Sequence, residues 1–317
     1  MEKLKVTVLP FAMSLLIVLV IMPFIIRYFR KKQLGQMTRD EGPSWHKEKS
    51  GTPTMGGIAF VLSSVVTIFL IVIFNIEDLI NVLPLIVFFV SYGSIGFIDD
   101  YIKVIMKRNL GLTSKQKFIA QLLLGLTFYI VLLLTGFDNQ LNLPFIGNIH
   151  ISYFYGIFTV FWLVGFSNAT NLTDGIDGLL GTTSLIAYAG YAYIAYQQNN
   201  LGVLLFAFSI IGGLLGFLFF NKKPADIFMG DLGSLALGAG LATMSILLNM
   251  EWTLLMIGII FVIETASVIL QVTYFKQTGK RLLKMSPIHH HFEMEGWSER
   301  KIVLVFSMIT LIAVVLT

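Results

Sequence analysis

The stretch Val82–Asp100 reads VLPLIVFFVSYGSIGFIDD, an apolar run over residues 82–98 that ends in two adjacent carboxylates. A run of this length is typical of a membrane helix, and the two acids would lie where that helix meets water. Taken alone, the pair fits an ordinary helix end that contacts only solvent. The reading changes because three further clusters of acids, amides or histidines follow apolar runs elsewhere in the chain.

The composition predicts an integral membrane protein. The chain has 317 residues, of which 56% are hydrophobic and 13% charged, and its mean hydropathy is +0.81. Apolar runs near twenty residues recur along it, as a bilayer requires of each spanning helix. The first run, 6–26, is longer than a signal peptide core and lacks a small-residue cleavage site. There are no cysteines, which excludes a disulfide framework and a thiolate metal site.

We expect an all-α membrane protein that forms a single domain over residues 1–317. The ten predicted spans are 6–26, 56–74, 82–98, 118–136, 154–168, 178–196, 202–220, 232–249, 252–275 and 302–317. All but two of the 22 Lys and Arg residues fall in the odd-numbered connections, and the even-numbered connections contain none. The positive-inside rule therefore places the odd connections in the cytoplasm and both termini outside.

Two other predictions follow from this arrangement. The basic residues are accounted for as topology determinants near anionic lipid, so nucleic acid is not an expected partner. Between spans 4 and 5, residues 137–152 alternate apolar and polar side chains around Pro144 and Gly147. That pattern predicts a small β-hairpin on the outer, periplasmic side.

The fifth connection contains the sequence NATNLTDGIDGL from Asn168 to Leu179. Asp174 and Asp177 lie there without any Lys or Arg in the loop, and Asn171 precedes Asp174 by one helical turn. Amide- and acid-rich turns are common as plain loops. As a block between two hydrophobic helices, however, this one favours a functional role.

The seventh connection places Asp231 between Gly230 and Gly233 at the start of a predicted span. The free N–H groups of a helix N-terminus suit anions, although Asp231 could equally serve only to cap the helix. Phe228 is either a buried anchor or a surface on which a ring could stack.

Two more segments complete the cytoplasmic set. Lys49–Gly57 (KSGTPTMGG) combines a lysine, hydroxyls and glycines that can hold a phosphate, although their order is not that of a P-loop. The ninth connection contains three adjacent histidines, residues 289–291. Adjacent side chains do not easily converge on one ion, so we expect one histidine to act in substrate recognition or proton handling. A solvated loop is the alternative.

Several carboxylates without thiolates favour Mg²⁺ or Mn²⁺, ions that commonly also bind substrate phosphates. The reaction class that this combination predicts is phosphoryl transfer.

These residues resemble the phospho-N-acetylmuramoyl-pentapeptide transferase (MraY) family, within the polyprenyl-phosphate N-acetylhexosamine-1-phosphate transferase superfamily. The resemblance rests on Asp99-Asp100, the 168–179 loop, the 228–231 segment and the ten spans. The 287–293 and 49–57 segments resemble the muramoyl-pentapeptide branch specifically.

The resemblance implies transfer of phospho-MurNAc-pentapeptide from UDP-MurNAc-pentapeptide to undecaprenyl phosphate, which gives lipid I and UMP in peptidoglycan synthesis. It also implies Mg²⁺, a homodimer in contact with membrane lipid, and a bacterial plasma membrane location with the active site on the cytoplasmic side. Asp99 would be the base for the lipid phosphate with Asp100 beside it, Asp231 a direct Mg²⁺ ligand, and His289 a neighbour of the sugar phosphate. The implied substrate-binding residues are Lys49, Thr54, Lys103, Lys115, Asn171, Asp174, Asp177, Asn221 and Phe228.

Alternatives stay open at this point. An aspartate could act as a nucleophile in a two-step route through a phospho-enzyme. A transferase of the same superfamily that uses UDP-N-acetylglucosamine is the nearest rival function. A secondary transporter is more remote, since it would require acids near the middle of the bilayer and paired broken helices. Glu264 is the one such acid, and we expect it to face the bundle interior or a polar cavity.

Overall fold

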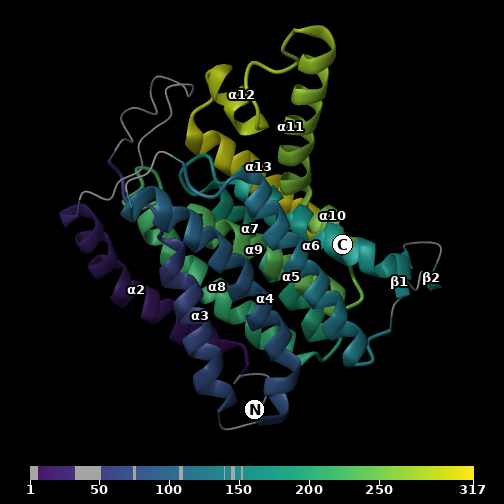
Figure 1. Ribbon diagram of the computed structural model, residues 1–317. Coiled ribbons are helices and arrows are strands. Elements are labelled where there is room, and N and C mark those ends of the chain that lie inside the picture. The colour runs from purple at the N-terminus through teal and green to yellow at the C-terminus, as the bar shows by residue number, and fades with distance from the viewer. Residues whose placement is uncertain are drawn as a thin grey trace.

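In the computed structural model, the protein is described over residues 6–32, 51–73, 76–106, 110–138, 140–143, 147–150 and 153–317. The described chain is mostly helical, and its helices pack side by side as a bundle (Figure 1). In order, the elements are α2 (Val8–Lys31), α3 (Gly57–Val72), α4 (Ile76–Asp100), the π-helical turn η2 (Tyr101–Ile105), α5 (Ser114–Leu134), β1 (Gln140–Leu143), β2 (Gly147–His150), α6 (Tyr153–Thr173), α7 (Leu179–Gln197), α8 (Leu201–Asn221), α9 (Gly230–Leu247), α10 (Thr253–Ile257), α11 (Ile259–Thr278), α12 (Ile288–Met294) and α13 (Glu299–Leu316).

Six stretches of helix in the described residues are long and apolar enough to cross a membrane. They are Val8–Lys31, Val82–Ile105, Ser114–Leu134, Leu201–Asn221, Gly230–Leu247 and Ile259–Thr278. Their number makes the protein an integral membrane protein. Every predicted span coincides with one helix or more, but the count of ten and the outer position of the termini stay predictions.

The ninth predicted span, 252–275, is not one continuous helix. It breaks at Gly258, whose φ of −95° and ψ of 22° are not helical and which ends α10 and begins α11. Helix α11 then extends beyond the bundle together with α12 (Figure 1), and its residues from Val272 onward are exposed. The apolar run continues through the break, so hydropathy alone did not reveal it.

Helix α9 lies at the centre of the bundle, against α3, α4, α6 and α7. Residues 232–246 of this helix are buried throughout, and most of them are Gly, Ala, Ser and Leu. Small side chains let the backbones of membrane helices approach closely. The residues at the start of α9 are therefore held by several helices at once.

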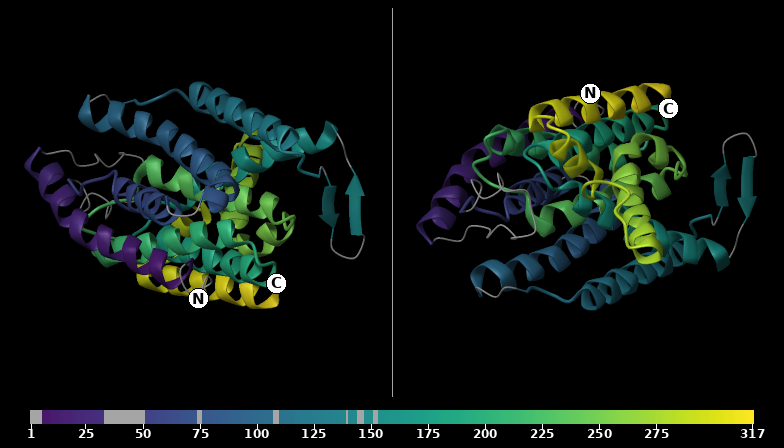
Figure 2. Two further views of the ribbon diagram at one scale, coloured as in Figure 1. Left: turned by 90° about the horizontal axis from the view of Figure 1, so that it is seen from below. Right: turned by 90° about the horizontal axis from the view of Figure 1, so that it is seen from above.

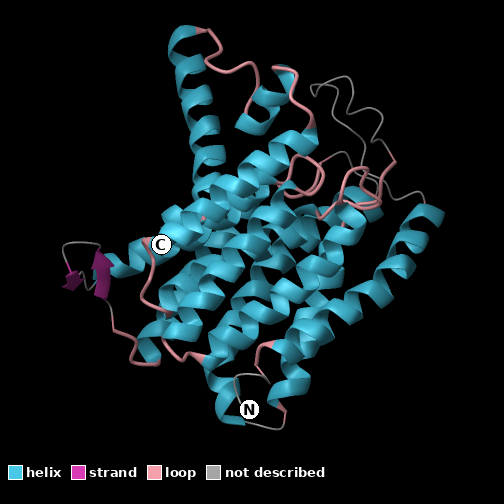
Figure 3. Ribbon diagram, turned by 180° about the vertical axis from the view of Figure 1, so that it is seen from behind, coloured by secondary structure: helices cyan, strands magenta, loops and turns pink. Residues whose placement is uncertain are grey.

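Strands β1 and β2 form an antiparallel pair in which Gln140 is opposite His150 and Leu143 is opposite Gly147. The pair projects sideways from the bundle (Figure 2). Its position on the outer side of the membrane stays a prediction. The longer described loops gather at the end of the bundle where α12 lies (Figure 1 and Figure 3).

Candidate active site

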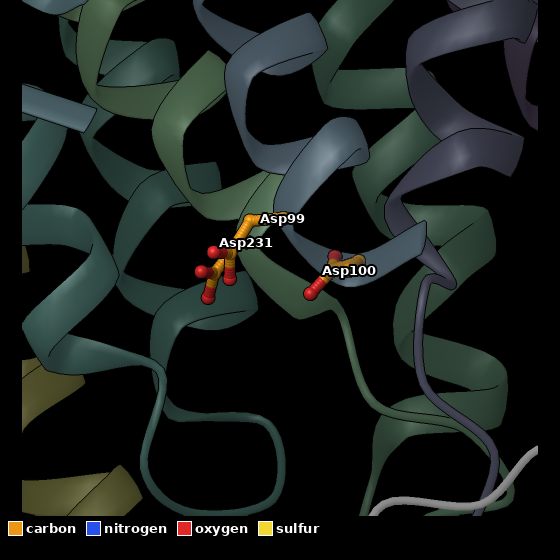
Figure 4. A group of neighbouring side chains, drawn as sticks. All are labelled: Asp99, Asp100 and Asp231. Atoms are coloured by element: carbon orange, nitrogen blue, oxygen red, sulfur yellow. The ribbon is translucent and has the colours of Figure 1, made fainter. Parts of the chain in front are cut away.

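Three carboxylates meet where α4 ends and α9 begins. Asp99 and Asp100 are the last two residues of α4, and Asp231 lies in the first turn of α9 (Figure 4). Each offers a ligand oxygen, and these oxygens lie within 4.8 Å of one another. Asp99 and Asp100 are buried, whereas the Asp231 side chain is 20% exposed. This is the one group of acids or histidines in the described residues that could hold a metal ion.

Gly96 determines how closely α4 approaches α9. A Cβ added to it would lie 2.5 Å from the Leu232 nitrogen and closer still to the Asp231 carbonyl group. A residue with a side chain therefore cannot occupy this position without separating the helices. Because Asp99 and Asp100 follow within about one helical turn, the same contact sets their distance from Asp231.

Two lysines hold the carboxylates together. The Lys117 ammonium lies 2.9 Å from Asp99 Oδ2 and 2.5 Å from Asp231 Oδ2. Lys103, in the π-helical turn, pairs with Asp99 and lies 3.6 Å from Asp231. Helical turns of this type are frequent at functional sites. The negative charge of the cluster is thus partly neutralised by these two cations.

Lys117 was missed by the sequence analysis, which selected Lys115. Lys115 is exposed and forms no ion pair with the described acids, so its assignment stays a prediction. Residues two apart on a helix do not share a face. Helical periodicity puts the two lysines on different faces, but only the packing of α5 decides that the face of Lys117 meets Asp99 and Asp231.

Backbone donors orient the two buried carboxylates. Leu112 N–H donates to Asp99 Oδ1 at 2.7 Å, and Leu232 N–H donates to Asp100 Oδ2 at 3.2 Å. Both carboxylates therefore have a fixed rotamer before any ligand binds.

The fifth connection lies beside Asp231, as its polar block suggested. Asn171 donates from Nδ2 to Asp231 Oδ1 at 3.0 Å and to Ser234 Oγ at 2.9 Å. Asp174 accepts the Gly230 backbone N–H. Burial, and secondarily the charge of Asp231, raise the pKa of Asp174 to about 7.

The end of the first connection, residues 53–56, forms backbone hydrogen bonds with Phe228 in the seventh connection. Phe228 N–H donates to Pro53 O at 2.8 Å, and Gly56 N–H donates to Phe228 O at 2.8 Å. Thr54 is buried between them, and the Phe228 ring is half-buried. Lys49 lies outside the described residues.

Asp177 and Asn221 form hydrogen bonds that connect the fifth connection to the seventh. Asp177 Oδ2 accepts the Ala225 N–H at 3.1 Å. Asn221 accepts the Gly178 N–H at 3.0 Å and donates to Ile227 O at 2.9 Å. Because both ends of the Asn221 amide are used inside the protein, the structure gives it a positioning role. Its predicted contact with the nucleotide stays a prediction.

The three histidines point to three different partners. His289 Nδ1 lies 3.0 Å from Glu264 Oε1, and both residues are fully buried, as expected for Glu264. His290 contacts Glu293 at 2.7 Å, while His291 accepts the Lys284 N–H.

The free side of His289 faces the fifth connection. Its Nε2 is buried and has no hydrogen-bond partner in the described chain. A Cβ built on Gly175 would lie 2.7 Å from His289 Cε1 and nearer to Nε2. The imidazole of His289 therefore lies directly against Gly175, the residue that follows Asp174.

Comparisons with known proteins point to one family. Residues 82–249 match the model described as glycosyl transferase family 4, and residues 49–61 match phospho-N-acetylmuramoyl-pentapeptide-transferase signature 1. Similar proteins named phospho-N-acetylmuramoyl-pentapeptide-transferase occur in Listeria monocytogenes serotype 4b and Enterococcus faecalis. The first is 51% identical over 309 residues, 97% of this chain and 95% of the relative. The second is 51% identical over 304 residues, 96% of this chain and 95% of the relative.

Proposed function

The chain belongs to the phospho-N-acetylmuramoyl-pentapeptide-transferase family, and we propose that the Asp99–Asp100–Asp231 cluster is its reaction centre. The protein is a phosphoglycosyl transferase of peptidoglycan synthesis that transfers phospho-MurNAc-pentapeptide. The donor we propose is UDP-MurNAc-pentapeptide and the acceptor undecaprenyl phosphate, with lipid I and UMP as products. The proposed site faces the cytoplasm of a bacterial plasma membrane, in a homodimer.

The donor set fits Mg²⁺, since it offers carboxylate oxygens and no thiolate. Asp231 would be the direct ligand, with oxygens of Asp99 and Asp100 within the same 4.8 Å group. When bound, such an ion neutralises charge on phosphate oxygens.

The reaction joins an oxygen of the lipid phosphate to the β-phosphorus of the nucleotide sugar. The bond from that phosphorus to the bridging oxygen breaks, and UMP leaves with the electron pair. A phosphate monoester is already largely ionised near neutral pH, so abstraction of a proton by Asp99 contributes less than neutralisation of charge. Lys103 and Lys117, which face the cluster, are suited to that task.

The two-step route through an aspartyl phosphate is less favoured by the contacts of Asp99. Its Oδ1 accepts the Leu112 N–H, and its Oδ2 is paired with both Lys103 and Lys117. Nucleophilic attack by this carboxylate would first require release of at least one of these partners.

The residues around the cluster supply the proposed donor site. Asn171 donates to Asp231, Asp174 accepts the Gly230 N–H, and Thr54 lies beside Gly230 in the segment that pairs with Phe228. We assign the nucleotide to the side of Thr54 and Phe228, where the exposed part of the aromatic ring can stack on uracil. His289 would lie near the sugar phosphate, Lys115 would lie on the phosphate path, and Lys49, Asp177 and Asn221 are proposed to bind the donor.

The experiment is UMP release by the purified protein with undecaprenyl phosphate and UDP-MurNAc-pentapeptide, with and without Mg²⁺. We expect turnover only with Mg²⁺. A matched reaction with UDP-N-acetylglucosamine tests the nearest rival. Turnover of that smaller donor, with none of the muramoyl-pentapeptide, would refute the assigned substrate. Uptake of a labelled solute into vesicles without UMP release would instead support a transporter.

Two variants test the reaction centre itself. Asp231→Asn should lower kcat by about a thousandfold, the upper range for loss of one electrostatic group. Asp226→Asn is the matched control, because Asp226 is exposed and, among the described residues, forms its ion pair with the exposed Arg30 at 2.6 Å. Near-normal turnover by Asp231→Asn would remove the metal assignment.

A further inference from the structure

An apolar groove lies between α8 and α13, with α7 along its floor. Its volume is about 680 Å³, and much of its lining is aliphatic or aromatic, including Leu215 and Phe219 of α8 and Leu304 and Met308 of α13. Phe219 is 54% exposed, Leu304 65% and Met308 50%. Since α8 is a candidate membrane span, the groove is a place where acyl chains can lie against the protein.

One end of the groove carries a basic rim formed by Lys222, Lys223 and Arg300. Lys223 pairs with Glu299, and Arg300 donates to the Lys223 carbonyl at 3.4 Å. Lys222 and Arg300 are exposed and form no ion pair with a carboxylate anywhere in the described ranges. Asp177 also lines this end, where its Oδ2 accepts the Ala225 N–H, so the rim holds one carboxylate beside these cations. The rim therefore offers two cations to an anion.

The groove is separate from the three carboxylates of the reaction centre, although Asp177, a proposed donor-binding residue, also lines its rim. Its lining comes from α7, α8 and α13 and from the loop ends beside them, whereas the three carboxylates and their lysines belong to α4, η2, α5 and α9. A phosphate bound between Lys222 and Arg300 would contact none of the three carboxylates.

We propose that this groove binds an anionic glycerophospholipid of the phosphatidylglycerol class. Its acyl chains lie along α8 and α13, and its phosphate lies between Lys222 and Arg300. Basic pockets between membrane helices on the cytoplasmic side are where anionic lipid headgroups bind. The carrier lipid fits less well, because its phosphate must reach the carboxylates to react. A second copy of the chain is the other possible occupant, and the disulfide test below separates it from a lipid.

The bound headgroup has a mechanical consequence. It would join the end of α8 to the start of α13 and so restrain the 222–229 connection. That connection leads directly to Phe228 and Asp231.

Lipid binding is measured with full-length purified protein, by native mass spectrometry, against phosphatidylglycerol and phosphatidylcholine. The test variant is Lys222→Gln combined with Arg300→Gln. The matched control is Lys276→Gln combined with Lys280→Gln, two exposed cations at the end of α11. Each cation near a membrane surface contributes roughly a fivefold preference for anionic lipid, so the test variant should lose about twenty-five-fold in phosphatidylglycerol affinity.

The control variant should keep its preference for phosphatidylglycerol. Equal affinity in the test variant and the parent would overturn the proposal. So would displacement of phosphatidylglycerol by equimolar undecaprenyl phosphate, which would assign the groove to the carrier.

The absence of cysteine permits a second measurement of what covers the groove. A fluorophore attached to Met308→Cys should be quenched by phosphatidylglycerol that carries bromine on its acyl chains. Rapid disulfide formation between two Met308→Cys chains, without such quenching, would assign the groove to a second copy and reject the lipid. Neither readout depends on turnover, so both stand apart from the proposed reaction.

Discussion

Replacement of Gly96 by alanine tests whether the α4–α9 contact sets the geometry of the reaction centre. The added Cβ would lie 2.5 Å from the Leu232 nitrogen and closer to the Asp231 carbonyl group. These are backbone atoms, so no side chain can rotate away. Ordinary contact begins near 3.4 Å, and α4 and α9 must therefore separate by at least about 1 Å. Asp99 and Asp100 would move away from Asp231 by a similar distance.

The expected effect is larger on turnover than on folding. A displacement of about 1 Å at reacting groups costs on the order of a hundredfold in rate. Forcing one methyl group into a close-packed contact lowers the free energy of unfolding by about 1–3 kcal/mol. Gly165→Ala in α6 is the matched control, since a Cβ there meets no atom within 4 Å. Its turnover should stay within about twofold, and its helix should be slightly more stable.

The assay is UMP release under saturating substrates, at a temperature well below the thermal transition of each variant. The transition is recorded in the same detergent, so that a loss of folded protein is not counted as a loss of catalysis. A folded Gly96→Ala protein with the kcat of the parent would refute the reasoning, because the carboxylate spacing would then not limit the reaction.

Two other predictions concern the charges around the cluster. Lys117→Met should lower kcat by about a hundredfold to a thousandfold, and Lys115→Met should lower it much less; the reverse order would contradict the ion pairs described above. Asp174 has its pKa raised from 3.8 to about 7, so the folded protein retains a proton that the unfolded chain has lost. The thermal midpoint of the metal-free protein should accordingly fall as the pH rises from 3.8 towards about 7, and Asp174→Asn should make this fall smaller. An unchanged slope in that variant would mean that Asp174 is not the group that titrates.

Much of the architecture could be predicted from the chain alone, for a simple reason. A bilayer accepts only backbones whose hydrogen bonds are satisfied internally, so long apolar runs have to be helices. The same constraint concentrates charges at helix ends, which is why Asp99, Asp100 and Asp231 stood out in the sequence. The family motifs in the 168–179 and 228–231 segments then predicted the chemistry.

Which residues meet was decided by packing between helices far apart in the chain. Helical periodicity says which side chains share a face, but the tilt and distance of the neighbouring helix determine what that face contacts. The Lys117 ion pairs, the Glu264–His289 contact and the approach at Gly96 all depend on such neighbours. The break at Gly258 could not be predicted either, because hydropathy shows where a chain is apolar and does not depend on its backbone angles.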